Sequence, residues 1–407
     1  MLRILDQAEA APFLNRASRR LDDALEIVKP IVQAVRDRGD VAVREYAEKL
    51  DGFTGESFIV ESCGELDPAL LESVTIAAKN IRDFAQQQLV KPWQTTTSDG
   101  RTLGQIIRPL DSVGVYVPAG RYPLLSTMLM TVIPAQVAGV GTITVVCPQP
   151  NTQILALAKW LGLKTIVQLG GAQAIASLAY GTQSIAKVQR IVGPGNSYVA
   201  AAKKLVAGDV GIDFVAGPSE IVIVANSGNP QWVALDMLAQ CEHDVDARAL
   251  LLTTSAAFAT QVQHEVAAQL ATLPTADVAA KSIEKNSAII VCADEVEIID
   301  LVNEIAPEHL SLPNNLLIGQ IRNAGSIFIG PFSTEAAGDY ASGPNHVLPT
   351  SGVAALRGGL SVNDFVKVIT TQSLSEDALR QLTPAVTQLA RAEGLEAHAR
   401  SVEVRQR

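Results

Sequence analysis

Two successive alternations of short β-branched runs with helical stretches constrain the fold of this chain more than any other feature. The first begins at Ser112 and includes the strand-like runs VGVYVP (113–118), TITVVCP (142–148), TIVQLG (165–170) and VQRIVGPG (188–195). The second includes EIVIVA (220–225), ALLLTT (249–254), AIIVCA (288–293) and SIFIGP (326–331). Because strands that alternate with helices form parallel βαβ units, each alternation predicts one doubly wound α/β module.

The segments on either side of these modules have helical patterns. Residues 24–50 carry apolar side chains at intervals of three and four, which is typical of amphipathic helices. After about Ser361, the stretches NDFVKVIT (363–370) and EDALRQLTPAVTQLARAEGL (376–395) are also expected to be helical. This last segment is too short for a core of its own, so we expect it to dock on another surface, with a second subunit as one candidate.

Composition and charge exclude several classes of protein. Hydrophobic residues make up 48% and charged residues 18% of the 407 residues, which excludes a disordered or fibrous chain. With 32 Lys and Arg against 42 Asp and Glu, the net charge of −10 argues against nucleic acid or an anionic membrane as the main partner. The sequence therefore predicts a soluble globular protein.

Cysteine spacing and one uncharged segment indicate in which cellular compartment the protein is expected. Cys63, Cys147, Cys241 and Cys292 form no CxxC pair, a pattern that indicates free thiols in a reducing cytoplasm. Residues 122–158 carry no formal charge but are broken by proline and glycine, so we expect a buried strand–helix–strand segment rather than a membrane span. The amino terminus has no signal-peptide pattern, and a cytoplasmic location is the expectation.

Gln240 and His243 lie three residues apart near the end of a predicted helix at 230–243. That spacing places both side chains on one helical face, as metal ligands or a substrate clamp require. The alternative is a polar helix end, where the helix dipole favours His243.

Glu308 and His309 stand side by side at a predicted helix-to-strand junction, in APEHL. Proton transfer near neutral pH favours an imidazole, or a carboxyl group whose pKa is raised by burial. The alternative is that Pro307 ends the helix and leaves both side chains solvated.

The loop GDYASGPNH (338–346) presents Asp339 and His346 just after the predicted strand SIFIGP. Open α/β sheets bind ligands outside the carboxyl ends of their strands, although an ordinary surface turn is the alternative.

No GxGxxG or P-loop pattern occurs, so the common nucleotide-binding motifs are missing. From these residues alone we expect an α/β enzyme with a metal held by Gln, Asp and His, and the substrate stays open.

Eight phrases, taken together and in order, resemble the histidinol dehydrogenase family over essentially the whole chain. They are VGVYVPAG (113–120), GGAQAIASLAYGT (170–182), VGPGNSYV (192–199), DFVAGPSE (213–220), AQCEHDVDA (239–247), APEHL (306–310), GDYASGPNHVLPT (338–350) and EGLEAH (393–398). One phrase alone would be weak, whereas eight in family order are specific. One departure is Ala119, in VPAG, where the family often has VPGG.

The resemblance implies an activity: zinc-dependent four-electron oxidation of L-histidinol to L-histidine through bound L-histidinaldehyde, with reduction of two NAD⁺, in the last steps of histidine biosynthesis. It implies one Zn²⁺ per subunit, held by Gln240, His243, Asp339 and His398. Glu308 and His309 match the family's proton-transfer pair. His398 would come from the partner subunit of a homodimer with a shared active site.

The resemblance also assigns binding positions and domains. Substrate contacts would come from the four metal ligands and His309, together with Ser219, His346 and Glu393. NAD contacts would come from Tyr116, Gln173 and Asn196. The fold implied is two Rossmann-like modules, 112–219 for NAD and 220–360 for zinc and catalysis. An amino-terminal helical region (1–111) would pack on the second module, and a small carboxyl-terminal domain (361–407) would swap between subunits.

Three rival functions remain at this stage. A relative of the family could oxidise another alcohol, such as a sulfonated diol, with the same zinc and NAD. A non-catalytic zinc- or nucleotide-binding protein would lack Glu308, His309 or a metal ligand, yet all are present. Metal-dependent hydrolysis would proceed without NAD.

Overall fold

The computed structural model describes residues 2–14, 19–118 and 124–406, so Ala119 lies outside the described residues. The chain forms two compact units. Unit 1 comprises Met1–Gln88 and Asp111–Phe365, and unit 2 comprises Leu89–Leu110 and Val366–Arg407.

Two six-stranded sheets form within the described residues of unit 1. Sheet 1 has the order β2 (Ile59–Glu61), β7 (Thr165–Val167), β6 (Thr142–Val146), β5 (Ser112–Tyr116), β8 (Arg190–Val192), β9 (Gly211–Ile212). Sheet 2 has the order β1 (Arg3–Leu5), β12 (Ala288–Val291), β11 (Arg248–Thr253), β10 (Glu220–Val224), β13 (His309–Leu312), β14 (Ser326–Ile329). Neighbouring strands are parallel except for β2 and β7. The prediction of two doubly wound modules is confirmed.

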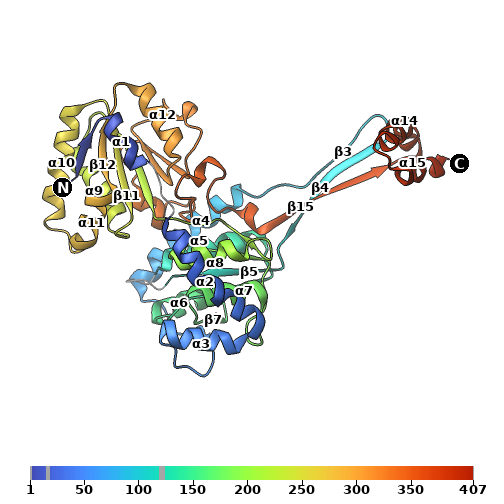
Figure 1. Cartoon of the computed structure of the whole chain (residues 1–407), viewed down its shortest axis with the longest axis horizontal. Helices are drawn as coiled ribbons and strands as arrows, with labels where there is room; N and C mark the ends of the chain where they lie inside the picture. The colour runs from blue at the N-terminus through green and yellow to red at the C-terminus, as the bar shows by residue number, and fades with distance from the viewer. Residues whose placement is uncertain (1, 15–18, 119–123, 407) are drawn as a thin grey trace. The chain divides into compact units, whose positions relative to one another are not determined.

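Both faces of sheet 2 are covered because successive side chains of a strand point to opposite faces. On β10, Ile221 and Ile223 join one apolar cluster, and Val222 and Val224 join another. Helices α9 (Pro230–Cys241), α10 (Ala256–Leu270) and α11 (Ala276–Asn286) complete the first cluster. Helices α1 (Gln7–Leu14) and α12 (Glu295–Ile305) complete the second (Figure 1).

The amino-terminal helices lie mostly beside sheet 1. Helix α2 (Arg19–Arg38) packs against α7 (Gly171–Tyr180) and α8 (Ser197–Val206), and α3 (Asp40–Asp51) also packs against α7. Strand β1 and helix α1 instead join sheet 2, by pairing with or packing on β12. The structure therefore divides residues 1–111 between the modules: β1 and α1 lie on the second module, and α2 and α3 pack on the first. Many of the buried residues of α7 and α8 are alanines, which let α2 approach closely.

The described residues of the uncharged segment at 122–158, which begin at Leu124, form helix, strand and helix rather than strand, helix and strand. Its elements are α5 (Leu125–Ala138), β6 and α6 (Thr152–Trp160), and α4 (Pro68–Gln87) packs on α5. Helix α5 is buried without a break from Thr127 to Ala135, so it lacks the apolar stripe that marks a surface helix. No helix among the described residues is long and apolar enough to cross a membrane.

Unit 2 contains an antiparallel sheet and a pair of helices. The sheet has the order β15 (Val366–Leu374), β4 (Arg101–Pro109), β3 (Trp93–Thr96), and α14 (Glu376–Ala392) packs on α15 (Glu396–Glu403). The prediction of a helix at 363–370 is wrong from Val366 onward. The β-branched run VKVITT favours a strand, and it pairs with β4 from Val366 opposite Pro109 to Leu374 opposite Arg101. The short elements are α13 (Glu335–Tyr340), η1 (Ile318–Gln320), η2 (Val353–Ala355), η3 (Val362–Phe365) and η4 (Val404–Gln406).

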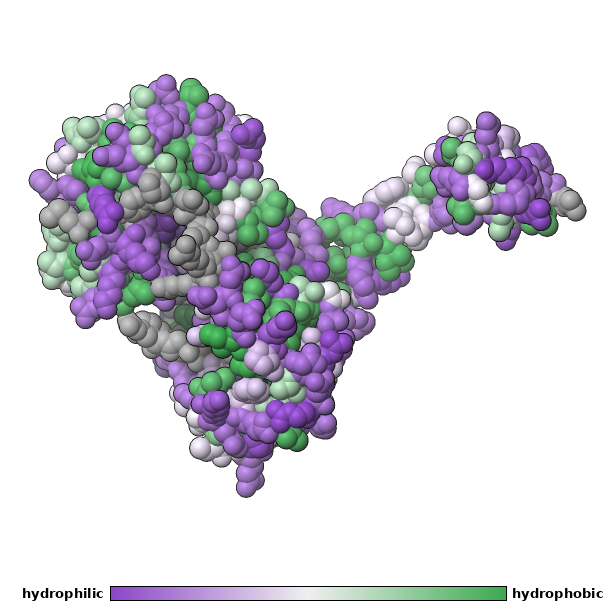
Figure 2. All heavy atoms as spheres, viewed as in Figure 1, coloured by the Kyte–Doolittle hydropathy of each residue, from purple (hydrophilic) through white to green (hydrophobic). Residues whose placement is uncertain are grey.

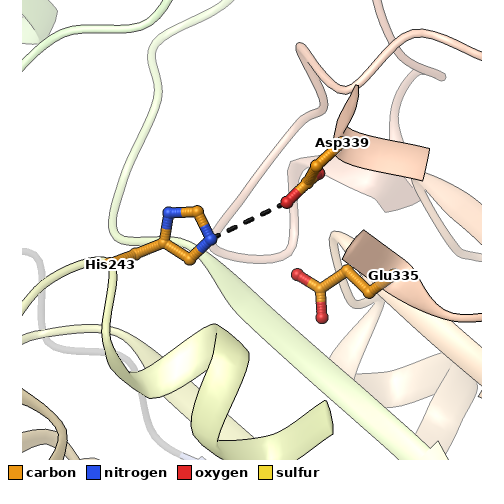
Figure 3. Close-up of side chains that lie close together, drawn as sticks. All are labelled: His243, Glu335 and Asp339. Carbon is orange, nitrogen blue, oxygen red and sulfur yellow. Dashed lines mark ion pairs between the residues drawn. The ribbon is translucent and has the colours of Figure 1, made fainter. Parts of the chain in front are cut away.

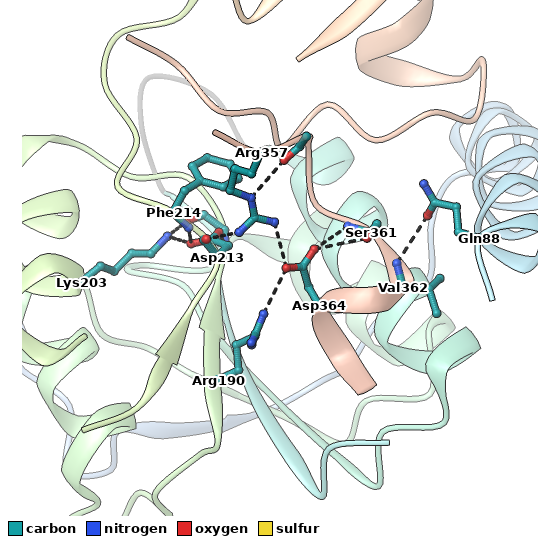
Figure 4. A network of polar contacts seen from close by, with 11 residues as sticks. Gln88, Arg190, Lys203, Asp213, Phe214, Arg357, Ser361, Val362 and Asp364 are labelled. Atoms are coloured by element: carbon teal, nitrogen blue, oxygen red, sulfur yellow. Dashed lines mark hydrogen bonds and ion pairs between the residues drawn. The ribbon is translucent and has the colours of Figure 1, made fainter. Parts of the chain in front are cut away.

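A buried ion pair fixes the turn that follows β8 (Figure 4). The ammonium of Lys203 and the carboxylate of Asp213 contact each other with almost no solvent exposure. Lys203 Nζ donates to the carbonyl of Gly193 at 3.1 Å, and Asp213 Oδ2 accepts from the amide of Gly193 at 2.8 Å. Arg357 donates to the backbone carbonyl of Asp213 and pairs with Asp364 at 2.9 Å. The network therefore ties sheet 1 to the segment that ends unit 1.

We expect Asp213→Ala to lower the free energy of unfolding by about 3–5 kcal/mol, because it leaves the Lys203 ammonium buried without its partner. Urea unfolding followed by circular dichroism measures the change. Asp83→Ala is the matched control, since the Lys79–Asp83 pair is more than half exposed and should contribute less than about 1 kcal/mol. Equal effects of the two substitutions would contradict a structural role for the buried pair.

Candidate functional site

The acid and imidazole side chains gather at the amino-terminal edge of sheet 2. Glu220 begins β10 and His309 begins β13, and Ile221 is paired with His309. Helices α9 and α12 run back from the opposite edge, so Gln240 in the last turn of α9 and Glu308 just after α12 both lie here. The expectation of a site at the carboxyl ends of the strands is thus not met in this module. Each helix that runs back along the sheet leads to the point where the next strand begins. The candidate residues lie on these connecting segments, near the starts of the strands.

His309 is the most enclosed of the candidate residues. It is 4% exposed, and its Nδ1 lies 3.2 Å from the backbone carbonyl of Glu220. Since a carbonyl only accepts, this contact assigns the ring proton to Nδ1 and leaves the lone pair on Nε2. Burial lowers the pKa of His309 to about 4, although the nearby Asp339 carboxylate acts in the opposite direction. The ring is therefore a neutral imidazole near pH 7, with Nε2 able to accept a proton.

Glu308 is buried beside it and is held by the backbone. Its Oε2 accepts from the amide of Glu220 at 2.8 Å and lies 3.8 Å from Nδ1 of His309. Burial raises the pKa of Glu308 well above its usual range, and the charges of Glu220 and Asp339 act in the same direction. A raised pKa of this kind makes a buried carboxyl group better suited to proton transfer than an exposed one.

Three side chains next to this pair could hold a metal ion (Figure 3). One ligand atom from each of His243, Glu335 and Asp339 lies within 4.8 Å of the others. Nε2 of His243 is 3.7 Å from Oδ2 of Asp339. Oxygen and nitrogen donors of this kind suit Zn²⁺.

Gln240 adds a fourth polar group on the turn before His243. It is fully buried, and neither its amide nitrogen nor its oxygen has a hydrogen-bond partner in the part of the chain that the structure describes. Helix α13, which carries Asp339, packs against α9, which carries Gln240. A buried amide without partners is costly, so this side chain fits a ligand that the protein itself does not supply.

The loop that follows α13 brings in His346. Its Nδ1 lies 2.7 Å from the backbone carbonyl of Asp339, and burial lowers its pKa. His346, His309 and Asp339 line one small cavity together with Phe328 and Asn345.

The other substrate candidates are more dispersed. Ser219 is partly exposed and directly precedes β10, at the same sheet edge as His309. Glu393 caps α14 and His398 lies in α15, both exposed in unit 2. Glu393 and His398 thus belong to a different unit from the remaining candidates.

The three nucleotide candidates lie at the carboxyl ends of strands of sheet 1. Tyr116 ends β5, and its hydroxyl accepts from the amide of Gly171 at 3.1 Å, at the start of α7. Gln173 is buried and donates to Asp51 at 2.9 Å. Asn196 follows β8 and caps α8 by accepting from two backbone amides at 3.1 Å. Since β5 and β8 are adjacent and their connections leave in opposite directions, this is the switch point where open α/β sheets bind ligands.

Two residues near these groups were not predicted from the sequence. Asp51 accepts from both Gln173 and the amide of Gly170, and burial raises its pKa. Glu335 lies four residues before Asp339, a spacing that places two carboxyl groups on one helical face. That spacing in the sequence could have identified Glu335 as a candidate, whereas no sequence pattern marks Asp51.

The fold and site define an α/β protein of two doubly wound modules with a buried acid–imidazole centre beside a candidate metal group. The histidinol dehydrogenase family model matches residues 14–406. A histidinol dehydrogenase of Halalkalibacterium halodurans is 47% identical over 93% of each chain, and one of Methanothermobacter thermautotrophicus is 44% identical over 97% of this chain and 96% of its own. The crystal structure of histidinol dehydrogenase from Elizabethkingia anophelis has a TM-score of 0.93 at 35% identity, with 99% of this chain and 98% of that chain covered.

The chain therefore belongs to the histidinol dehydrogenase family, as the resemblance implied. Its activity is that of EC 1.1.1.23, an NAD-using oxidoreductase at the end of histidine biosynthesis. An acetylating aldehyde dehydrogenase from Geobacillus thermoglucosidasius shares the fold, with a TM-score of 0.51 at 13% identity.

We expect Gln240→Leu to weaken zinc binding at least roughly tenfold without lowering the stability of the metal-free protein. The reason is that the Gln240 amide has no hydrogen bond to lose within the described residues. Competition with a chromogenic chelator measures zinc affinity, and thermal unfolding of the metal-free protein measures stability. Gln261→Leu, at an exposed position of α10, is the control. Unchanged zinc affinity in Gln240→Leu would exclude Gln240 as a ligand.

Proposed function

We propose that both oxidations of L-histidinol, to bound L-histidinaldehyde and then to L-histidine, take place at the amino-terminal edge of sheet 2, with His309 as the general base. The observation that carries this proposal is the orientation of His309. Its Nδ1 faces the Glu220 carbonyl at 3.2 Å, and the ring lines the cavity shared with Asp339 and His346. A neutral imidazole with a free Nε2 is suited to take the hydroxyl proton while the carbon gives its hydride to NAD⁺.

Glu308 is proposed to act between the two oxidations. An aldehyde cannot give up a second hydride until water has added to its carbonyl carbon. Glu308, oriented by the amide of Glu220, takes a proton from that water, while His309 gives the proton that it gained in the first oxidation to the carbonyl oxygen and becomes neutral again. His309 then accepts the hydroxyl proton of the hydrate as the second hydride leaves. Retention of the aldehyde in an enclosed site prevents its loss to solvent.

Gln240, His243 and Asp339 are proposed to hold one Zn²⁺ per subunit, with His398 as a further ligand. Two observations support this set. The amide of Gln240 has no hydrogen-bond partner among the residues that the structure describes, and His243 lies close to Asp339. When bound, zinc orients the substrate and polarises its oxygen. The substrate would also contact Ser219, His346, Glu393 and His309 in addition to the four ligands.

NAD is proposed to bind at Tyr116, Gln173 and Asn196. Their place at the switch point of sheet 1 supports this assignment, because nucleotides bind there in open α/β sheets. Burial raises the pKa of Tyr116 to about 12, so its hydroxyl stays neutral and can accept from the amide of Gly171.

A homodimer with a shared active site is proposed to supply Glu393 and His398 from the partner. The support lies in unit 2 itself, where β15 is exposed along nearly its whole length, including Val368 and Ile369. Figure 2 shows hydrophobic surface along the strands of this unit. An exposed apolar strand of this kind is typical of a surface that a partner covers.

A cytoplasmic location is proposed as well. None of the four cysteines forms a disulfide, and Cys147, Cys241 and Cys292 are buried. Unpaired cysteines of this kind suit a reducing compartment.

The first test measures NADH formed per L-histidinol consumed, with and without a chelator. We expect two NADH per substrate, with loss of activity on chelation and recovery on addition of zinc. One NADH with released aldehyde would contradict the role of Glu308. No NADH from histidinol in the zinc-loaded protein would favour a relative that oxidises another alcohol.

Glu308→Gln tests the hydration step separately. We expect the oxidation of L-histidinaldehyde to slow by about 10²- to 10⁴-fold, since a general base is removed, with a smaller effect on the oxidation of L-histidinol. Single-turnover kinetics with each substrate separates the two steps. Equal losses in both would show that Glu308 does not serve hydration alone.

A further inference from the structure

Helix α13 presents carboxyl groups to both nitrogens of the His309 ring. Oε1 of Glu335 lies 3.3 Å from Nδ1, and Oδ1 of Asp339 lies 3.8 Å from Nε2. The two acids are four residues apart and therefore share one face of the helix. Asp339 belongs to the proposed zinc ligands, whereas the proposed reaction gives Glu335 no task.

Glu335 is buried without the partners that such a group normally has. It is 4% exposed, and neither of its oxygens forms a hydrogen bond within the described part of the chain. The contact with His309 Nδ1 is its nearest ion-pair distance. Burial of a carboxyl group without partners is costly in free energy. The contact with the imidazole of His309 is the interaction that can offset this cost.

A glycine allows α13 to lie this close to His309. A Cβ at Gly338 would stand 2.5 Å from Cε1 of Phe328, a distance at which atoms overlap. The Phe328 ring in turn packs on the His309 ring, with centroids 5.9 Å apart. Thr334 caps the helix by accepting from the amide of Ala337 at 3.3 Å. The start of α13, and with it Glu335, is therefore set against the imidazole by packing and by the cap.

We propose that Glu335 is a positioning residue for His309. Its carboxyl group and the Glu220 carbonyl lie around Nδ1–H, so that the proton stays on Nδ1 while Nε2 receives the proton of the substrate hydroxyl. The group thus fixes the ring orientation and stabilises the imidazolium, as the third member does in hydrolase triads. This inference rests on the proposed role of His309 as base.

The test compares Glu335→Gln and Glu335→Ala with the wild-type enzyme in its zinc-loaded form. We expect kcat for histidinol oxidation to fall by about 10- to 100-fold in Glu335→Ala and by less in Glu335→Gln, which keeps the size and an accepting oxygen. KM for histidinol and bound zinc per subunit should stay unchanged. Glu295→Gln, at the exposed first residue of α12, is the control.

The outcomes separate this role from others. Loss of zinc in either variant would make Glu335 a metal ligand and overturn the proposal, as would unchanged kcat. Should Glu335→Ala fail to fold, Glu335→Gln decides by the split between kcat and KM. His309→Asn is measured in parallel. If His309→Asn retains turnover, the base lies elsewhere and the proposed function fails. If His309→Asn is inactive while both Glu335 variants turn over normally, only the positioning role fails.

Discussion

Three carboxyl groups surround the buried imidazole of His309. The order of strands and helices in sheet 2 places all four groups at the same edge of the sheet. Glu308, Glu335 and Asp339 approach His309 from the end of α12 and from α13. Burial disfavours the negative charge of Glu308 and Glu335, which raises the pKa of both carboxyl groups. A cation next to His243 and Asp339 would favour the charged forms. A metal ion bound there would therefore make Glu308 and Glu335 easier to ionise.

The two modules have the same strand order but use opposite edges of their sheets. In sheet 1 the nucleotide candidates follow the carboxyl ends of β5, β7 and β8, as in other open α/β sheets. In sheet 2 the acid and imidazole groups stand where β10 and β13 begin. The candidate residues of the two modules thus lie at opposite sheet edges despite the shared topology, and the fold alone would not have located those of sheet 2.

The sequence predicted the two modules well because parallel strands buried on both faces are continuous apolar runs. It identified His309, Asp339 and His346 as candidates because each stands in a short motif with other acidic, amide or imidazole residues. These three residues line one cavity. It did not predict β15, although the β-branched run VKVITT favours a strand, because the pairing partner lies far away in the chain. Glu335 was not predicted because it shares a face with Asp339 only if the short segment 335–340 is helical. Asp51 was not predicted because its partner Gln173 lies far from it in the sequence.

The pairing of β4 with β15 has a consequence for biosynthesis. Pro109 ends β4, and Val366 begins β15, 257 positions further along the chain. At about 5–20 residues per second, a ribosome needs roughly 13–50 s to supply the second strand after the first. During that interval β3 and β4 form at most a two-stranded hairpin, which is marginal in water and leaves an open edge. A nascent chain of this protein therefore passes through a stage at which it can pair wrongly with its neighbours on a polysome, and chaperones that cover strand edges would have most effect then.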